Sequence, residues 1–425
     1  MSFRKRQIPQ RVDAIVIGGG IIGCATALWL ARAGMRPVLC EKGRIGGEQS
    51  GRNWGWIRRI GRDPAELPLA RRAMELWRQM PRLAGTDPGF VPCGIAYLCR
   101  NEEELERRHL WLKANRDAAG EDIRLLSGRE TTELFPGAAV SFTGALHAPH
   151  DGRAEPLTAT RAIAEAAKRA GVILLENCAV RDITLQGGAI HGVQTERGEI
   201  RTGTVVLAGG IWSRMLCDRL GLRLPQLGVI NSVQYTAPLD GAPETSAGEG
   251  DCAFRRTVEG GYAIAHWRLS ETIVTPQHLR FARDFLPALQ ESWKDLPPRP
   301  ASPFQPWARS ASWNTDGKTP FEEVRVLDPP PSTRILGKAL KALQRDFPAF
   351  AKARIVRLQA GVIDVLPDVL PVIDSPAEVP GLVIATGFSG HGFGIGPAAG
   401  EAAAALAAGK SPLTDISAFS LARFR

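Results

Sequence analysis

The chain has 425 residues, of which 44% are hydrophobic and 23% charged, so it is long enough for two domains with large cores, and extensive disorder is excluded. The formal net charge of +9 would suit an anionic partner, but lysines and arginines are spread along the chain without a basic block, so we expect no nucleic-acid binding. Seven cysteines without a Cys-x-x-Cys pair indicate neither a disulfide framework nor a metal site, and they favour a reducing compartment.

The N-terminal residues 1–13 are basic and lead directly into a predicted strand, without the apolar stretch of a signal peptide. No later apolar run reaches the roughly 18 residues that a membrane-spanning helix needs. We therefore expect a cytoplasmic protein without a membrane anchor.

The first predicted elements form a β-α-β unit. Residues 14–17 are a short apolar run typical of a buried strand, the glycines at 18–20 form a turn, and residues 21–33 have helical periodicity. A second apolar run at 37–40 ends at Glu41.

The turn of this unit carries a G-x-G-x-x-G motif, made of Gly18, Gly20 and Gly23 with Ile21 and Ile22 inside it. Glycines at this spacing allow a tight turn and let a pyrophosphate approach the N–H groups at the helix N-terminus. Glu41 lies at the end of the next strand, where a carboxylate accepts hydrogen bonds from ribose hydroxyls and repels a 2′-phosphate. The combination favours an adenine dinucleotide over an ordinary glycine turn.

The ten residues GEQSGRNWGW at 47–56 follow this unit and combine two tryptophans and an arginine with glycines and small polar residues. Trp54 and Trp56 are two positions apart, so in an extended segment their side chains share one face. One interpretation is a shared core face. The other is that the segment lines a ligand site.

The middle of the chain continues the same pattern. Residues 160–170 are alanine-rich with helical periodicity, and strand-like segments follow at 172–175, as a pair within 179–195, and at 204–207. We expect these strands to extend the nucleotide-binding sheet.

The composition changes between residues 226 and 349. Prolines cluster at 297–306, and alternating segments such as 262–265 are typical of antiparallel strands. The last 70 residues return to the first pattern, with a strand at 382–385, a glycine-rich turn and a helix at 398–408.

These elements predict an α/β fold with a discontinuous, Rossmann-like nucleotide-binding domain and an antiparallel-sheet α+β domain that covers a cleft. The nucleotide-binding domain takes segments 10–90, 150–225 and 350–425, and the second, substrate-binding domain takes 91–149 and 226–349.

The glycine-rich segment 386–397 opens the last predicted helix and indicates which adenine dinucleotide is bound. A second helix N-terminus supplies N–H donors and a positive dipole end, which suits a flavin whose pyrimidine becomes anionic on reduction. FAD is therefore the expected cofactor. His391 is either an acid–base residue or a packed loop histidine whose backbone matters more than its ring.

DAIVIGGGIIG at 13–23 together with GFSGHGFGIGPAAGE at 387–401 resembles the D-amino-acid oxidase superfamily of FAD-dependent oxidoreductases. The segments at 47–56, 205–214 and 312–326, and DISAFSLARF at 415–424, look most like bacterial L-amino acid deaminases and related L-amino acid oxidases. The resemblance spans nearly the whole chain.

This resemblance implies non-covalently bound FAD, with the segment after Glu41 running along the flavin. Trp56 would face the substrate, whereas we place Trp54 in the core. The residues assigned to the cofactor are those of the G-x-G-x-x-G motif with Glu41, then Lys42, Gly47, Gln49, Ser50, Gly51, Arg52, Asn53, Val180, Gly209, Gly210 and Gly361, and finally Gly390, His391, Gly392, Phe393, Gly394 and Ile395.

Arg255 occupies the place of the family's carboxylate-binding arginine in this resemblance, and a bidentate arginine is the usual partner of a carboxylate. Arg256 would then point to the other face of the strand. An alignment slip of one residue would exchange the two, and a third alternative is that both are surface arginines.

The leading functional hypothesis is oxidative deamination of L-α-amino acids to 2-oxo acids and ammonia, with O2 as the acceptor and H2O2 as a product. Arg255, Trp56 and His391 are the expected catalytic-site residues, although hydride transfer to the flavin strictly demands no acid–base side chain. Trp56, Trp267 and Trp313 favour an apolar pocket for large or aromatic side chains. O2 is expected because the deaminases carry a hydrophobic anchor that this N-terminus lacks.

Two alternatives stay open. One keeps the flavin and changes the substrate to a D-amino acid, glycine, sarcosine or a proline-type amine, with a non-oxygen acceptor. The other is a flavin-containing binding or tRNA-modifying protein. No basic patch interleaved with aromatic residues supports this alternative. The oligomeric state is also open, with a homodimer as one alternative.

Overall fold

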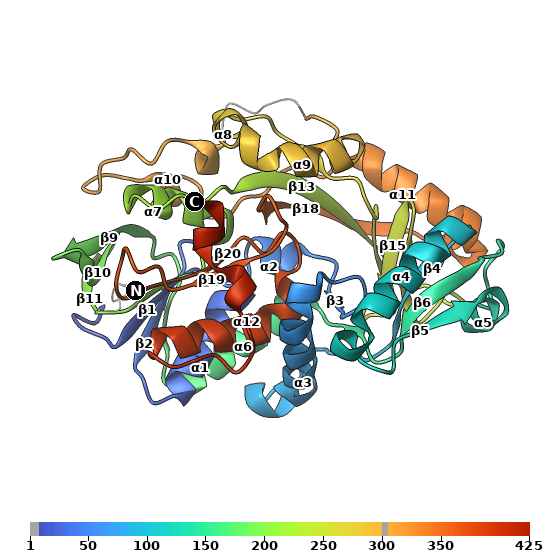
Figure 1. The fold of residues 1–425 in the computed structure, drawn as a ribbon, viewed down its shortest axis with the longest axis horizontal. Coiled ribbons are helices and arrows are strands. Elements are labelled where there is room, and N and C mark those ends of the chain that lie inside the picture. Colours follow the sequence, from blue (N-terminus) through green and yellow to red (C-terminus); the bar gives the residue numbers. More distant parts are fainter. Residues whose placement is uncertain (1–7, 300–304) are drawn as a thin grey trace, which may run out of the picture.

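A six-stranded sheet is built from short apolar segments far apart in the sequence (Figure 1). In a computed structural model, which describes residues 8–299 and 305–425, five of its strands are parallel and the edge strand β19 is antiparallel to β20. In order across the sheet, the strands are β19 (Val372–Asp374), β20 (Leu382–Thr386), β12 (Val205–Leu207), β1 (Ala14–Ile17), β2 (Pro37–Cys40) and β8 (Ile173–Leu175). The expectations from the sequence for residues 1–7, Pro300 and Pro303 concern positions outside the described residues.

One face of this sheet is covered by helices. Ala14 and Val16 of β1 pack into the same apolar cluster as the helices of this layer, which Figure 1 shows gathered beside β1 and β2. The layer comprises α1 (Ile21–Arg32), α3 (Leu67–Ala84), α6 (Pro156–Arg169) and α12 (Gly392–Ala407). A Cβ at Gly400 would meet the Cβ of Ala25 at 2.4 Å, so α1 and α12 are in closer contact than any larger residue would permit.

The opposite face carries a separate three-stranded antiparallel sheet. Ile15 and Ile17 of β1 point into the cluster that includes its side chains. The strands are β9 (Val180–Gln186), β10 (Ala189–Thr195) and β11 (Gly198–Arg201). The prediction that the strand pair within 179–195 extends the nucleotide-binding sheet is therefore wrong, because the pair closes with β11 and packs across the parallel sheet.

A larger, mostly antiparallel sheet of nine strands forms the other half of the fold. Its strands are β4 (Ile95–Cys99), β5 (Arg124–Ser127), β6 (Gly144–Ala148), β13 (Leu227–Thr236), β14 (Ser246–Glu249), β15 (Cys252–Arg256), β16 (Tyr262–Ala265), β17 (Glu271–Thr272) and β18 (Ile355–Val365). β18 pairs with β13 along its whole length, although the sequence assigned it to the nucleotide-binding domain. The division of the chain into domains stays a prediction, while the two-sheet α/β fold is confirmed.

Shorter elements join and cover the two sheets. The helices are α2 (Gln49–Arg52), α4 (Glu102–Ala119), α5 (Gly128–Leu134), α7 (Ser213–Arg219), α8 (Pro276–Arg280), α9 (Ala282–Ser292), α10 (Pro320–Glu323) and α11 (Thr333–Asp346). β3 (Trp56–Ile57) pairs with β7 (Gly152–Arg153). The 3₁₀ helices are η1 (Pro64–Glu66), η2 (Gly210–Trp212), η3 (Trp293–Asp295), η4 (Pro306–Ala308), η5 (Pro348–Lys352), η6 (Ser417–Phe419) and η7 (Leu421–Phe424).

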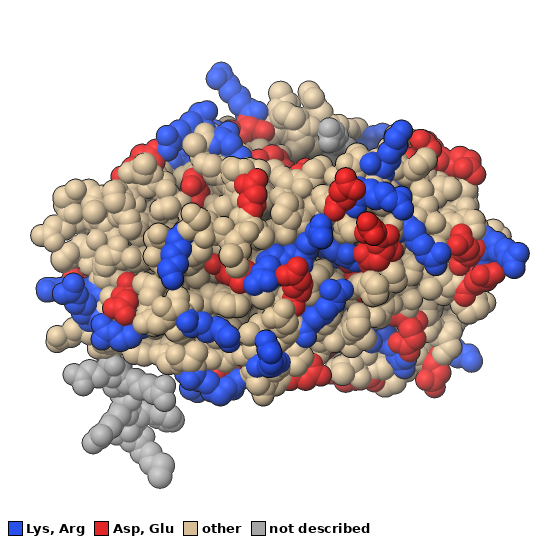
Figure 2. All heavy atoms as spheres, turned by 60° about the horizontal axis from the view of Figure 1, so that its bottom comes forward, with Lys and Arg blue, Asp and Glu red and all other residues tan. Residues whose placement is uncertain are grey.

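On the face that Figure 2 shows, the positive charge of the chain is dispersed. Figure 2 shows Lys and Arg interspersed with Asp and Glu on one face. Arg72, for example, bonds Glu401 across the α3–α12 contact and Glu75 on its own helix. On this face, therefore, the net charge of +9 does not collect into a single cationic surface.

The last helix begins at Gly392 and not at Ala398, where the sequence pattern placed it. Glycine and proline are poor helix formers. The first two turns of α12 nevertheless contain Gly392, Gly394, Gly396 and Pro397. Tertiary contact overrides this propensity, because the glycines let the helix lie directly against neighbouring segments. A Cβ at Gly396 would meet the side chain of Ile21 at 2.9 Å.

The α1–α12 contact predicts a difference between two helical glycines. Gly400→Ala should lower the free energy of unfolding by about 1–3 kcal/mol, because the added methyl must displace Ala25 or the backbone of Thr26. Gly337→Ala in α11 is the matched control. Its Cβ would meet nothing within 4 Å, so it should raise the free energy of unfolding by about 0.5–1 kcal/mol. Denaturant unfolding of both variants measures the difference, and a Gly400→Ala protein as stable as the parent would contradict the close contact.

Candidate functional site

A cavity of about 420 Å³ lies at the carboxyl ends of the parallel strands β1, β2, β12 and β20. Residues 46–56 and part of β18 form its other wall, and the loop before α12 closes one end. Its volume is in the range of small-ligand and cofactor sites, and this edge of a parallel sheet is where α/β proteins bind ligands.

Backbone N–H groups and one carboxylate shape the end of the cavity nearest α1. A Cβ at Gly18 would lie 2.3 Å from the carbonyl oxygen of Ala208, so only glycine fits this turn. The Glu41 carboxylate accepts N–H bonds from Gly19 at 2.6 Å and from Gly43 at 2.7 Å. Burial raises the pKa of Glu41, and these N–H groups hold its oxygens at the cavity edge.

Most residues that the sequence assigned to the cofactor line this cavity. They are Gly18, Gly20, Ile21, Ile22, Glu41, Lys42, Gly47, Gln49, Ser50, Arg52, Asn53, Val180, Gly209, Gly210, Gly361, Gly390, His391, Gly392, Phe393 and Gly394. The residues therefore fit FAD. α1 and α12 both begin at one cavity, glycines of both turns line it, and the Glu41 carboxylate lies at its edge. Non-covalent attachment stays a prediction.

Three of the assigned residues are not on the cavity wall. A Cβ at Gly23 would lie 2.0 Å from the carbonyl oxygen of Gly18, and one at Gly51 would lie 2.2 Å from that of Gly46. These two glycines allow close backbone packing behind the wall. Ile395 is 1% exposed and belongs to the apolar core between the helices.

The tryptophans around residues 54–56 form an aromatic wall. Trp56 lies 5.7 Å from both Trp54 and Trp267 between ring centroids, and all three line the cavity. Trp54 packs against two apolar core clusters, as expected, and it also lines the cavity, where its indole N–H bonds Asn231 at 3.0 Å. Trp313 lies elsewhere, packed against Phe321 at 5.3 Å.

Arg58 and Arg62 also line the cavity and were missed from the sequence. A signal for Arg58 was present, because it lies two residues after Trp56 and side chains alternate along an extended segment. The intervening Arg59 points away from the cavity. Its guanidinium bonds the fully buried Asp151 at 2.8 Å and Asp122 at 2.6 and 2.8 Å.

The end of the cavity nearest α12 holds a buried group of charges. His391 Nδ1 lies 3.1 and 3.3 Å from the two carboxylate oxygens of Glu66, and Arg62 Nη1 lies 3.7 Å from one of them. Burial acts to raise the pKa of Glu66, but His391 and Arg62 outweigh it and lower the value to about 2. Burial and the neighbouring Arg58 lower the pKa of Arg62 to about 10.

Two buried donors at this end have no hydrogen-bond partner within the described chain, namely Trp56 Nε1 and Arg62 Nη1. Trp56 is 8% exposed and Arg62 is 3% exposed. A buried donor without an acceptor costs about 1–3 kcal/mol. Both residues lie on the cavity wall, and the charge of the Arg62 nitrogen is compensated by the Glu66 carboxylate at 3.7 Å.

Arg255, expected to hold the substrate carboxylate, is not on the cavity wall. Its two terminal nitrogens bond the Glu155 carboxylate at 2.7 and 3.0 Å, and Nε donates to the carbonyl oxygen of Trp54. Trp54 and Gly55 thus separate Arg255 from the cavity. The assignment is corrected: Arg255 is fully buried and supports this wall from behind. Arg256 pairs with Glu244 instead.

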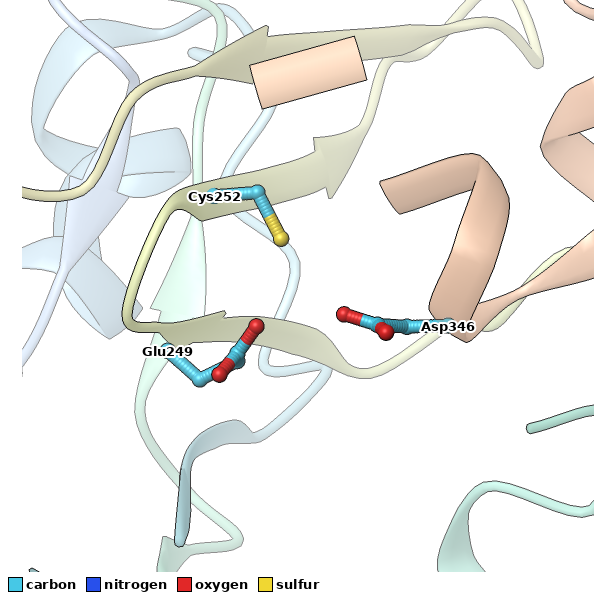
Figure 3. Close-up of side chains that lie close together, drawn as sticks. All are labelled: Glu249, Cys252 and Asp346. Carbon is cyan, nitrogen blue, oxygen red and sulfur yellow. The ribbon is translucent and has the colours of Figure 1, made fainter. Parts of the chain in front are cut away.

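A second cluster of potential ligand atoms lies in the large sheet, and none of its residues lines the cavity. Figure 3 shows Glu249, Cys252 and Asp346 directed toward one another from β14, β15 and α11. The Arg100 guanidinium bonds both carboxylates, at 2.6 and 2.8 Å to Glu249 and closely to Asp346. The Arg100 guanidinium thus occupies carboxylate oxygens that a metal cation would need as ligands. The absence of a metal ion stays a prediction.

No helix within residues 8–299 and 305–425 is long and apolar enough to cross a membrane.

The buried pair Arg255–Glu155 generates a prediction about stability. Arg255→Ala should lower the free energy of unfolding by about 3–5 kcal/mol, because it leaves the Glu155 carboxylate without its partner. Arg256→Ala is the matched control. Its partner Glu244 is 61% exposed, so the loss should stay below about 1 kcal/mol. Chemical denaturation checks both, and a stable Arg255→Ala protein with a strongly raised KM would restore the carboxylate-binding role.

Known proteins resemble this chain over its full length. The L-amino acid deaminase from Proteus myxofaciens, solved in complex with anthranilate, is 34% identical with a TM-score of 0.94, covering 100% of this chain and 96% of that chain. The L-amino acid deaminase from Proteus vulgaris is 30% identical with a TM-score of 0.93 and full coverage of both chains.

Among curated relatives, 4-methylaminobutanoate oxidase (formaldehyde-forming) from Paenarthrobacter nicotinovorans is 27% identical over 98% of this chain. The chain spans 46% of the length of that relative. The model of the FAD dependent oxidoreductase family matches residues 13–406. This chain therefore belongs to the FAD-dependent oxidoreductase family that includes D-amino-acid oxidase.

Proposed function

We propose that the protein catalyses the oxidative deamination of L-α-amino acids to 2-oxo acids and ammonia. The observation that carries this proposal is the pair of cavity arginines beside an aromatic wall, at the α12 end of a cavity that fits FAD. The likeness to two L-amino acid deaminases supports the L configuration. FAD, when bound, supplies a hydride acceptor for the substrate Cα–H.

Arg58 and Arg62 are the proposed partners of the substrate carboxylate. Within the described chain, Arg58 makes no ion pair. Its Nη1 donates only to the carbonyl oxygen of Ile60, at 2.6 Å. Arg62 leaves Nη1 without a hydrogen-bond partner. A carboxylate between the two guanidinium groups would compensate buried positive charge.

The aromatic wall defines the preferred side chain. Trp54, Trp56 and Trp267 present ring surface to the cavity, and Tyr97 packs behind them at 4.8 Å from Trp267. Large apolar rings favour the burial of large or aromatic substrate side chains. Each pair of aromatic rings adds about 0.5–1.5 kcal/mol to the free energy gained from burying apolar surface. We therefore expect aromatic and large aliphatic L-amino acids to be preferred over small or charged ones.

O2 is the proposed electron acceptor, with H2O2 as the product, and the relative named an oxidase supports this choice. The cytoplasmic location and a homodimeric state also stay proposals. A second candidate substrate class is favoured by the name of that same relative. It is an N-methylated amine such as sarcosine, with glycine, proline or a D-amino acid as further alternatives.

A substrate panel tests the proposed function directly. Under anaerobic conditions, L-phenylalanine and L-leucine should bleach the visible absorbance of the flavin, whereas D-phenylalanine, glycine, sarcosine and L-proline should not. This readout follows substrate oxidation independently of the acceptor. Bleaching by sarcosine alone would move the assignment to the second class. Admission of air should then yield H2O2 in step with the 2-oxo acid, and turnover that requires an added dye would reject O2.

Arg58→Ala tests the carboxylate site. The lost charge-assisted pair contributes roughly 2–5 kcal/mol, and about 1.4 kcal/mol corresponds to a tenfold change. The value of kcat/KM should therefore fall by about 30- to 5000-fold. FAD content should be unchanged. Arg108→Ala is the matched control, because Arg108 and Arg58 both stack on Tyr97, at 4.9 and 5.8 Å, but Arg108 is not on the cavity wall. Equal kinetics of the two variants would place the carboxylate elsewhere.

A further inference from the structure

The loop before α12 presents one edge of the His391 ring to the cavity and hides the other. Nδ1 faces the carboxylate of Glu66, which is fully buried and lies behind the cavity wall. His391 itself lines the cavity, and its side chain is 23% exposed. The ring therefore directs its free edge, which carries Nε2, toward the space where substrate binds.

The contact with Glu66 fixes the tautomer of His391. With its pKa near 2, Glu66 is ionised at neutral pH and can only accept a hydrogen bond. The proton of a neutral imidazole must then lie on Nδ1, as the donor to Glu66. Nε2 is left with a lone pair, so the group exposed to the cavity is a hydrogen-bond and proton acceptor.

The charges around His391 come from two elements. Burial lowers its pKa, Arg62 and Arg58 lower it further, and only Glu66 opposes them. The two arginines follow β3, whereas Glu66 ends η1. The first turn of α12, whose N-terminus is a positive dipole end, begins directly after His391. The imidazole is therefore neutral at physiological pH and able to take a proton.

A bound α-amino acid needs such an acceptor. Its amine is protonated in solution, and an ammonium group has no lone pair to assist the departure of hydride from Cα. The positive surroundings that favour the carboxylate also disfavour the ammonium group. Transfer of one proton from the nitrogen to an acceptor beside the Glu66 carboxylate places the positive charge next to a negative one and frees the electron pair.

We propose that His391 Nε2 accepts a proton from the ammonium group of the bound amino acid, and that Glu66 is the positioning residue that fixes its tautomer. The substrate N–H bond breaks, its electron pair stays on nitrogen, and an Nε2–H bond forms, which gives a neutral amine and an imidazolium. No electrons are transferred in this step. The inference rests on the proposed function and adds a catalytic residue to it.

The pH dependence of flavin reduction tests this role in the FAD-loaded protein with L-phenylalanine in anaerobic stopped flow. Because the pKa of His391 is lowered below its ordinary value near 6.5, the parent should stay active through neutral pH. Its rate should fall only as the pH drops through that lowered pKa and the ring becomes protonated. His391→Gln should lower the rate at neutral pH by roughly 10²- to 10⁴-fold. The loss should shrink as the pH approaches the pKa of the free substrate amine.

Glu66→Gln separates positioning from packing. The amide oxygen can still accept the Nδ1–H bond, but the negative charge is lost, so the inflection should move to lower pH and the rate plateau should fall. Glu401→Gln is the matched control. It removes a carboxylate of α12 that is bonded to Arg72 of α3 at 2.7 Å, outside the cavity. Its pH profile should equal that of the parent.

A second readout is independent of turnover. Nitrogen-15 NMR of labelled histidine in the holoprotein should show His391 protonated on Nδ1 in the parent, with a titration that moves to lower pH in Glu66→Gln. An Nε2–H tautomer, or a pH profile of flavin reduction shared by the parent and His391→Gln, would overturn the proposal. Failure of every amine to bleach the parent flavin would instead reject the proposed function.

Discussion

The close contact of α1 with α12 is the constraint on which the site depends. Gly400 and Gly396 let α12 lie against Ala25 and Ile21 of α1 with almost no side chain between the backbones. Both helices consequently begin at the same cavity, although hundreds of residues separate them. Two helix N-termini then offer N–H groups and positive dipole ends to one bound molecule. FAD matches this arrangement, because it has a charged pyrophosphate and a flavin ring that becomes anionic on reduction.

A second constraint orients the arginines at the substrate end. The segment after β3 carries Arg58, Arg59 and Arg62, and their directions are set by the buried Asp151. This carboxylate accepts the backbone N–H bonds of Arg59 at 2.7 Å and Ile60 at 3.2 Å, besides the Arg59 guanidinium. With Arg59 held away from the cavity, alternation along the chain turns Arg58 toward it. Arg62 follows on the same side, where it contacts the carbonyl oxygen of His391 at 3.5 Å.

Local patterns predicted the nucleotide end well. The strand at 14–17, the glycine turn and the strand at 37–40 depend on neighbours in sequence, and the motif brings Glu41 onto the backbone of Gly19. Pairs that are distant in sequence were beyond such patterns. Strand periodicity could predict the strand face on which Arg255 lies. It could not predict that Arg255 pairs with Glu155, 100 residues away, or that the Trp54 segment lies in front of it.

The substrate end shows the same limit. Nothing near residue 66 identifies Glu66 as a partner of His391, since 325 residues separate the two. Trp54 was assigned to the core because an indole pair in an extended segment is equally consistent with a packed face and a ligand wall. In the structure Trp54 does both, and its bond to Asn231 depends on β13 of the other sheet.

The charge balance of the substrate end links carboxylate binding to the state of the amine. Arg58 and Arg62 carry two positive charges, Glu66 carries one negative charge, and His391 is neutral, so these four residues leave one positive charge unbalanced at the substrate end. One carboxylate neutralises it. A zwitterion would bring an additional ammonium charge into the same low-dielectric space, where like charges repel strongly. Transfer of the ammonium proton to His391 leaves the total charge unchanged but moves it beside the Glu66 carboxylate, and the amino acid is left in the anionic form whose nitrogen has a free electron pair. Binding and activation of the substrate thus depend on the same buried charges.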